Sequence, residues 1–172
     1  MTLPTRVNQA MAIAAVQEFL DDPDWQRQIA EYGWEISRIA ALTLIVALKA
    51  KPLGATAEVF TLRLICDHDP TYPPDVQFVN PATYQYAPDL DLHHVARLEA
   101  QDCYVHPRYG YQNLYPYGPQ LICSSVTLGY YFSNHTPTPD QAWQPCQHRI
   151  GTSIYTVYRT LHSADYRGRH GE

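Results

Sequence analysis

Prolines and tyrosines are concentrated in one stretch of the chain, and this stretch limits the folds that are open to it. Residues 70–119 contain 8 of the 14 prolines and 8 of the 14 tyrosines. Prolines at this density prevent long helices and strands, because each one fixes φ and removes a backbone donor. The tyrosines nevertheless supply apolar surface for packing. We therefore expect an ordered, mostly irregular segment here, in which only 90–99 (LDLHHVARLE) has the pattern of a helix.

The composition favours a single folded domain over residues 1–172. Charged residues make up 17% of the chain and apolar residues 45%, a balance that excludes an intrinsically disordered chain. A chain of this length also buries enough surface for a proper core. The net charge is −5 and the pI is about 5.8, so we do not expect the broad basic surface of a nucleic-acid-binding protein.

Neither a membrane span nor an export signal is expected. The longest apolar run, 39–48, has ten residues, whereas a membrane-spanning helix needs about 20. This run therefore predicts a buried strand or helix. Residues 1–20 lack a strong hydrophobic region and have the pattern of an amphipathic helix. These features favour a cytoplasmic protein whose four cysteines are thiols and not disulfides.

Helical and extended patterns follow each other in an order typical of an α+β fold. Apolar residues recur at helical spacing near both ends of the chain, and short apolar runs bounded by turn residues lie between them. Thr5 is the expected N-cap of the first helix, and Gly33 is the expected C-cap of a second helical turn. The expected elements are a helix at 6–20, a helical turn at 25–32, an antiparallel meander of strands at 41–49, 58–66 and 76–79, a short apolar stretch at 121–123, a helix from about 148 to 161 and a frayed tail at 167–172.

Four short motifs occur in sequence along this framework. They are Tyr72–Phe78 (YPPDVQF), Tyr104–Pro107 (YVHP), Ile122-Cys123 and Trp143–Pro145 (WQP). These motifs and the order of the elements resemble a ubiquitin-conjugating enzyme (E2), whose sequence carries a YPxxPPxVxF segment, an HPN motif, an Ile-Cys active site and a WSP. The resemblance implies a UBC-like fold with an N-terminal helix, an antiparallel β-meander, a long irregular active-site segment and a C-terminal helix.

The same resemblance implies an activity and its partners. Cys123 would accept a ubiquitin-like modifier protein from an E1-like adenylating enzyme as a thioester and pass it to a target protein, without a cofactor. His106 would order the catalytic loop, as the HPN histidine does in this family. The first helix, at 6–20, would lie at the end that docks the E1-like enzyme.

The chain departs from ordinary ubiquitin-conjugating enzymes around the active site. Phe78 and Cys123 are 45 positions apart, Cys123 and Trp143 are 20 apart, and both intervals are longer than usual. Arg108 stands where the HPN asparagine, which helps the oxyanion, is expected. With its short C-terminus the chain resembles divergent bacterial E2-like proteins. Those are encoded beside a ubiquitin-like protein, an E1-like enzyme and often a JAB-type peptidase, in operons linked to phage defence.

The residues beside Cys123 agree with this chemistry. Thioester exchange needs an accessible sulfur with some thiolate character and donors for a transient oxyanion. Gly118, Pro119 and the serines at 124–125 flank Cys123 and favour an exposed, extended segment. The alternative is that Cys123 is a small buried apolar residue, which is the usual state of a free cysteine.

Three later residues are candidates by position alone. Asn134 and His135 follow Cys123 by eleven and twelve residues, and either could fold back to supply the missing oxyanion donor. Asp140 precedes the WQP motif, where the family often carries an acidic residue that orients an attacking amine. Each of these residues, and His106 as well, has the alternative interpretation of an ordinary loop residue.

Cys66 and Cys146 are expected to pack, whereas Cys103 lies in the proline-rich segment near His106, where a zinc site is the alternative. Regular zinc sites space their ligands in paired patterns such as CxxC…HxxxH. No such pattern occurs, so no metal is expected. The three cysteines and their nearest histidines form the pairs Cys66-x-His68, Cys103-x-x-His106 and Cys146-x-His148.

Two other functions remain open from the sequence. One is a non-catalytic binding module of the E2-variant type, against which the Ile122-Cys123 pair argues. The other is a Cys-His hydrolase that uses Cys123 with His106 or His135, although no local protease signature supports it. The identity of the modifier and of the target is not encoded in these motifs.

Overall fold

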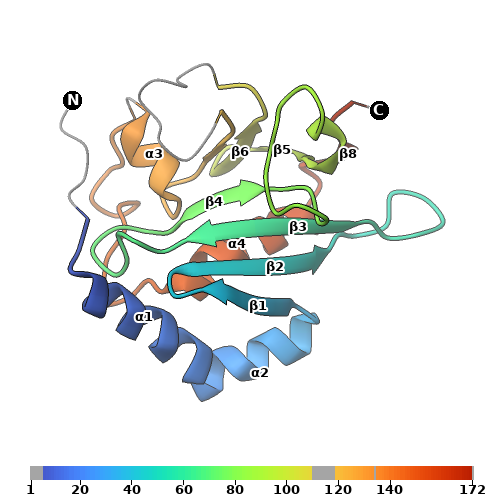
Figure 1. Cartoon of the computed structure of the whole chain (residues 1–172). Coiled ribbons are helices and arrows are strands. Elements are labelled where there is room, and N and C mark those ends of the chain that lie inside the picture. Colours follow the sequence, from blue (N-terminus) through green and yellow to red (C-terminus); the bar gives the residue numbers. More distant parts are fainter. Residues whose placement is uncertain (1–5, 110–118, 134, 172) are drawn as a thin grey trace.

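The computed structural model describes residues 6–109, 119–133 and 135–171. The chain has an α+β fold, in which N-terminal helices precede two antiparallel sheets and a C-terminal helix contacts strands of both (Figure 1). The elements are α1 (Gln9–Asp21), α2 (Pro23–Tyr32), β1 (Glu35–Ala40), β2 (Thr43–Lys49), β3 (Val59–Ile65), β4 (Asp75–Phe78), the 3-10 helix η1 (Leu92–His94), β5 (Ala96–Ala100), β6 (Cys103–His106), β7 (Leu121–Cys123), α3 (Leu128–Phe132), α4 (Ile150–Leu161) and β8 (Tyr166–Arg169).

Polar caps determine where the two N-terminal helices begin and end. The Asn8 side chain accepts a hydrogen bond from the second amide of α1 and begins this helix, while the predicted cap, Thr5, lies outside the described residues. Asp22 ends α1, and its carboxylate accepts two amides in the first turn of α2. Gly33, at φ 65°, ends α2 in the left-handed conformation, as predicted. In the described part of the chain, no helix is long and apolar enough to cross a membrane.

Strands β1 to β4 form a meander in which each neighbouring pair is antiparallel. The sequence predicted three of these strands and missed β1. Five of the six β1 residues are exposed, so this strand lacks the alternation that marks a half-buried strand. The other three strands direct alternate side chains into the core, namely Leu44, Val46, Leu48, Phe60, Leu62, Leu64, Val76 and Phe78.

The apolar run 39–48 is divided between two strands. It crosses the hairpin that joins β1 to β2, where the Arg38 guanidinium donates to the Ala41 carbonyl at 2.7 Å from Nη2. The predicted strand at 41–49 is therefore correct from Thr43 onward, and its first two residues form the turn.

The segment predicted to be mostly irregular supplies β5 and β6, the two central strands of a second sheet in the order β7-β6-β5-β8. The helix predicted at 90–99 is wrong, because a single 3-10 turn is followed directly by β5. In β5 the buried residues are Ala96, Leu98 and Ala100, and this period of two belongs to a strand. Residues 110–118 of the same segment lie outside the described residues.

The tail predicted to be frayed, 167–172, forms most of β8 and pairs with β5. Arg169 fixes it, because its guanidinium donates to the carbonyls of His93 (2.8 Å) and Val59 (2.9 Å). The same guanidinium lies 4.4 Å from the centre of the Phe60 ring and forms an ion pair with Glu58 at 2.5 Å. These long-range partners are what the sequence pattern could not indicate.

The predicted C-terminal helix is confirmed as α4, which lies behind the meander in Figure 1. One face of α4 is buried, with Ile154, Val157 and Leu161 in the core. Gly151 allows α2 to approach α4, because a Cβ at this position would lie 2.4 Å from the Trp25 ring.

Candidate active site

Gln120 connects the strand that carries Cys123 to the free edge of the meander. Its fully buried side chain accepts from the Phe78 N–H (2.7 Å) and donates to the Phe78 carbonyl (3.0 Å). The amide thereby takes the place of a further strand beside β4, where unpaired backbone groups would otherwise be buried. The start of β7 is held in place as a result.

Strand alternation places Cys123 on the outer side of β7. Ile122 points into the core and is 1% exposed, so the next side chain faces the other way. Cys123 is partly exposed and lies opposite Tyr104 of β6. His106 lies opposite Leu121 on the same face of the sheet, and its ring packs against Tyr104 at 4.7 Å between centroids.

The chain that follows Cys123 is tied to three neighbouring elements. The Thr127 hydroxyl donates to the Ile122 carbonyl (2.6 Å) within the same turn. The Ser153 hydroxyl of α4 donates to the Val126 carbonyl (2.6 Å), and the Leu128 N–H donates to a carbonyl of the segment before β4. These bonds fix the backbone on both sides of Cys123.

His135 is the histidine that reaches Cys123 in the described part of the chain. Its Nε2 lies 3.5 Å from the Cys123 sulfur, which is a hydrogen-bonding distance for sulfur. Its Nδ1 lies 2.6 Å from the Ser133 carbonyl oxygen and 2.8 Å from the Ser133 hydroxyl. The Tyr130 ring of α3 stacks on the imidazole at 4.8 Å between centroids and 28° between planes. The imidazole is thus held at both nitrogens and on one face.

The environment of Cys123 favours the neutral thiol. Burial raises the pKa of the Cys123 thiol above its ordinary value. Burial, and then the charge of His135, lower the pKa of His106. Burial and the neighbouring Cys123 raise the pKa of the Tyr130 phenol. At neutral pH Cys123 therefore rests as the neutral thiol and not as the expected thiolate.

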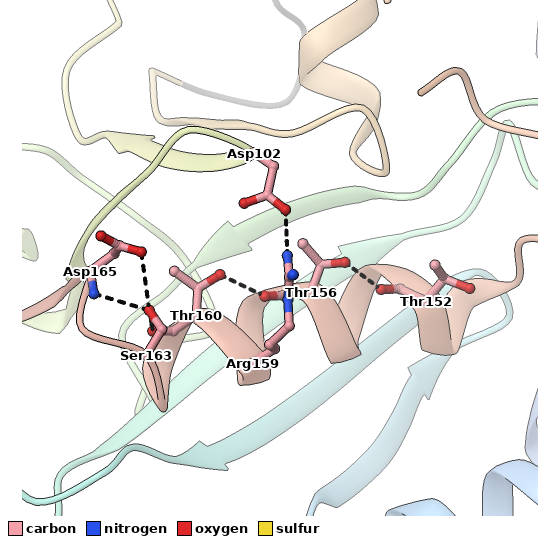
Figure 2. A network of polar contacts seen from close by, with 7 residues as sticks. All are labelled: Asp102, Thr152, Thr156, Arg159, Thr160, Ser163 and Asp165. Atoms are coloured by element: carbon pink, nitrogen blue, oxygen red, sulfur yellow. Dashed lines mark hydrogen bonds and ion pairs between the residues drawn. The ribbon is translucent and has the colours of Figure 1, made fainter. Parts of the chain in front are cut away.

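Cys123 opens on a polar groove of about 640 Å³. The groove extends from the turn between β5 and β6 to α3 and to the turn after α4, and its lining includes Asp102, Ser124, Ser125, Tyr130, Gln141 and Asp165. Figure 2 shows how the end of α4 holds the acidic wall of this groove. The Arg159 guanidinium pairs with Asp102 at 2.5 Å, and the Ser163 hydroxyl accepts from the Asp165 N–H at 3.0 Å.

Two further residues singled out by their position, Asp140 and Arg108, interact with partners other than the Cys123 sulfur. Asp140 is exposed in the loop before the WQP motif, and a hydrogen bond to Thr138 lowers its pKa. Arg108 forms an ion pair with Asp89 at 3.0 Å. Asn134 lies outside the described residues. The contacts of His135 with Ser133 and Tyr130 had no signal in the sequence, because they depend on how the loop after α3 folds back.

Of the remaining cysteines, Cys66 packs as predicted, Cys103 is buried as well, and Cys146 does not pack. Cys66 and Cys103 are fully buried, and burial raises the pKa of the Cys103 thiol to about 12. Cys146 is exposed, so the prediction that it packs is wrong. It lies in a turn before α4 instead of within the buried face of that helix.

Within residues 6–109, 119–133 and 135–171, no group of three or more His, Cys, Asp or Glu residues is arranged to hold a metal ion. No protein-family model, no curated protein and no solved structure matches this chain.

Proposed function

We propose that the chain is an E2-like carrier in a bacterial ubiquitin-like conjugation pathway. Cys123 accepts the C-terminal acyl group of a ubiquitin-like protein from an E1-like enzyme and transfers it to a target protein. The observation that carries the proposal is the partly exposed Cys123, which opens on the groove with His135 Nε2 at 3.5 Å. The antiparallel meander that follows the N-terminal helices supports it, as do the four ordered motifs.

The raised pKa of Cys123 suits a carrier. A thiol of high pKa is a poor leaving group, so its thioester resists hydrolysis by water. Burial raises the pKa of this thiol, which favours an intermediate that persists until an acceptor arrives. An amine or a second thiol, which is a better nucleophile than water, then completes the transfer.

The test uses the purified chain with its modifier, the E1-like enzyme and ATP. We expect an adduct that a thiol reductant removes, because reductants cleave thioesters by exchange and leave amides and esters intact. Cys123→Ala abolishes the adduct, and Cys123→Ser leaves at most an ester that resists the reductant. Cys146→Ala is the matched control, since this cysteine is exposed and lies outside the groove lining. No adduct from an E1-like enzyme that is itself charged would contradict the proposal and favour a non-catalytic binding module.

A Cys-His hydrolase is the second candidate, and the contact between Cys123 and His135 is the observation that favours it. Both candidates form an acyl group on the same sulfur and differ in what removes it. A hydrolase releases the free modifier into water at a steady rate without any acceptor, whereas a carrier keeps its thioester until an amine or thiol is added. Measuring the lifetime of the isolated adduct with and without an added amine separates them.

A further inference from the structure

We infer that His135 is the general base of Cys123 and that Ser133 is the positioning residue that fixes the tautomer of His135 for this role. The inference rests on the proposed function and deepens it by naming the group that moves the proton. Thioester exchange does not by itself require a coupled base, so the pairing is a specific property of this site.

The tautomer follows from the two contacts of His135 Nδ1. A carbonyl oxygen only accepts hydrogen bonds, and the Ser133 carbonyl lies 2.6 Å from Nδ1. Nδ1 therefore carries the proton in the neutral imidazole. The Ser133 hydroxyl, 2.8 Å from Nδ1, donates to the Tyr130 carbonyl at 3.1 Å and is free to accept. Nε2 is left with a lone pair, and it is Nε2 that faces the sulfur at 3.5 Å.

The groups that face His135 come from three elements. Cys123 approaches from β7, His106 from β6 and Tyr130 from α3. Protonation of His135 disfavours a second positive charge on His106, because the two histidines interact electrostatically. The stacked Tyr130 ring keeps the imidazole plane aligned with the sulfur. The site therefore holds one mobile proton between Cys123 and His135.

The proton and the bonds balance in both half-reactions. In loading, Nε2 takes the proton from Sγ as the sulfur attacks the modifier's acyl carbon. The Sγ–C bond forms, the bond to the E1 sulfur breaks, and the departing thiolate takes the proton from the imidazolium. In transfer, an acceptor amine forms the new bond to carbon, its proton passes to Nε2, and the released Cys123 sulfur recovers a proton from Nε2.

The test measures the alkylation of Cys123 by iodoacetamide between pH 5 and pH 10. Cys146 is exposed, so all variants carry Cys146→Ser to remove its background. With His135 intact, the rate rises as the imidazole loses its proton, stays level, and rises again as the thiol itself ionises. In His135→Gln the level region disappears, and the neutral-pH rate falls by about 10²-fold, the usual contribution of a general base. The deficit closes at high pH, where hydroxide supplies the thiolate.

Chemical rescue separates a base from a merely structural histidine. In His135→Ala, added imidazole restores the alkylation rate in proportion to its concentration. His162→Gln is the matched control, because this histidine is exposed at the end of α4 and lies outside the groove lining; it keeps the level region. Nitrogen NMR shifts of His135 above neutral pH report a proton on Nδ1. A level region that persists in His135→Gln, a folded His135→Ala without rescue, or a proton on Nε2 each overturns the inference.

The outcomes distinguish this inference from the proposed function. If His135→Gln forms the modifier adduct on Cys123 at the unaltered rate at every pH, His135 is not the general base, and the proposal of an E2-like carrier still holds. If the alkylation profile shows the level region but no modifier adduct forms, the pairing of Cys123 with His135 is supported and the proposal of an E2-like carrier is contradicted.

Discussion

The meander and the second sheet are held together by different kinds of interaction. The central strands β2 and β3 each have seven residues and bury leucine and phenylalanine side chains against α4 and the N-terminal helices. Strand β7 has three residues, and its position depends on directional bonds from Gln120, Thr127 and Ser153. Burial of apolar side chains stabilises the meander, whereas a few directional hydrogen bonds fix the position of the strand that carries Cys123.

The contrast extends to the buried polar groups. Around Cys123 the buried side chains of Gln120, Thr127 and Ser153 all have partners. In the meander, Asp75 is fully buried at the start of β4, and neither of its carboxylate oxygens has a hydrogen-bond partner among the described residues. An unpartnered buried carboxylate is costly when it is charged, so Asp75 keeps its proton to higher pH in the folded protein.

The largest expected effect is the loss of a core side chain of the meander. Leu62 of β3 is fully buried between its partners Val46 and Phe78. We expect Leu62→Ala to lower the free energy of unfolding by about 2–5 kcal/mol, from lost burial and the cavity that remains. Urea denaturation measures the change. Val59→Ala in the same strand is the control, because Val59 is 54% exposed, and a change of more than about 0.5 kcal/mol there would contradict the contrast.

The second prediction concerns the pH dependence that Asp75 imposes on the meander. Burial raises the pKa of this carboxyl to about 8. The charge of Asp67 adds to this increase, and the charge of Arg63 opposes it. In the unfolded chain the pKa of this carboxyl is about 3.9. Between these values the folded state holds a proton that the unfolded state has lost, so stability falls as pH rises. The stabilising contribution is complete below about pH 4 and is lost as pH passes about 8.

The variant that tests this dependence is Asp75→Asn, which removes the titrating group and keeps the shape. We expect the slope of unfolding free energy against pH to become flatter between about pH 4 and 8. Asp69→Asn is the comparison, since burial raises the pKa of Asp69 to about 7. The pH range over which Asp69 affects stability therefore ends at a lower pH than that of Asp75. An unchanged slope in Asp75→Asn would mean that this carboxylate is solvated in the folded protein.

Local signals made part of the fold predictable from the sequence. Gly33 acts on its nearest neighbours, so the C-terminal end of α2 was predicted correctly, although the helix begins at Pro23, two residues before the predicted start. The buried face of α4 repeats at helical spacing and was equally clear. Cys123 was chosen as the candidate because Ile122 precedes it in a short apolar run between turn residues, and its role stays a prediction.

The missed features depend on partners far away in the chain. Strand β1 is exposed on nearly all of its residues and is defined by pairing with β2. Strand β8 is set by bonds from Arg169 to residues about a hundred positions earlier. From the sequence, His135 and Asn134 were equal candidates by position. The orientation of the His135 ring depends on a contact with the Ser133 backbone carbonyl, and the sequence does not indicate backbone contacts of this kind.

The smallest expected effect, and the sharpest test of the contrast, comes from Gln120. Gln120→Ala leaves the buried N–H and carbonyl of Phe78 without partners, and we expect a loss of about 1–3 kcal/mol. Because the bond joins β7 to β4, hydrogen exchange should accelerate in β7 and β6 while β2 and β3 keep their protection. Gln147→Ala is the matched control, since this glutamine is exposed before α4. If hydrogen exchange accelerated equally in both sheets, the two sheets would unfold together. The Gln120 bonds would then stabilise the whole fold and not only the position of β7, which contradicts the prediction.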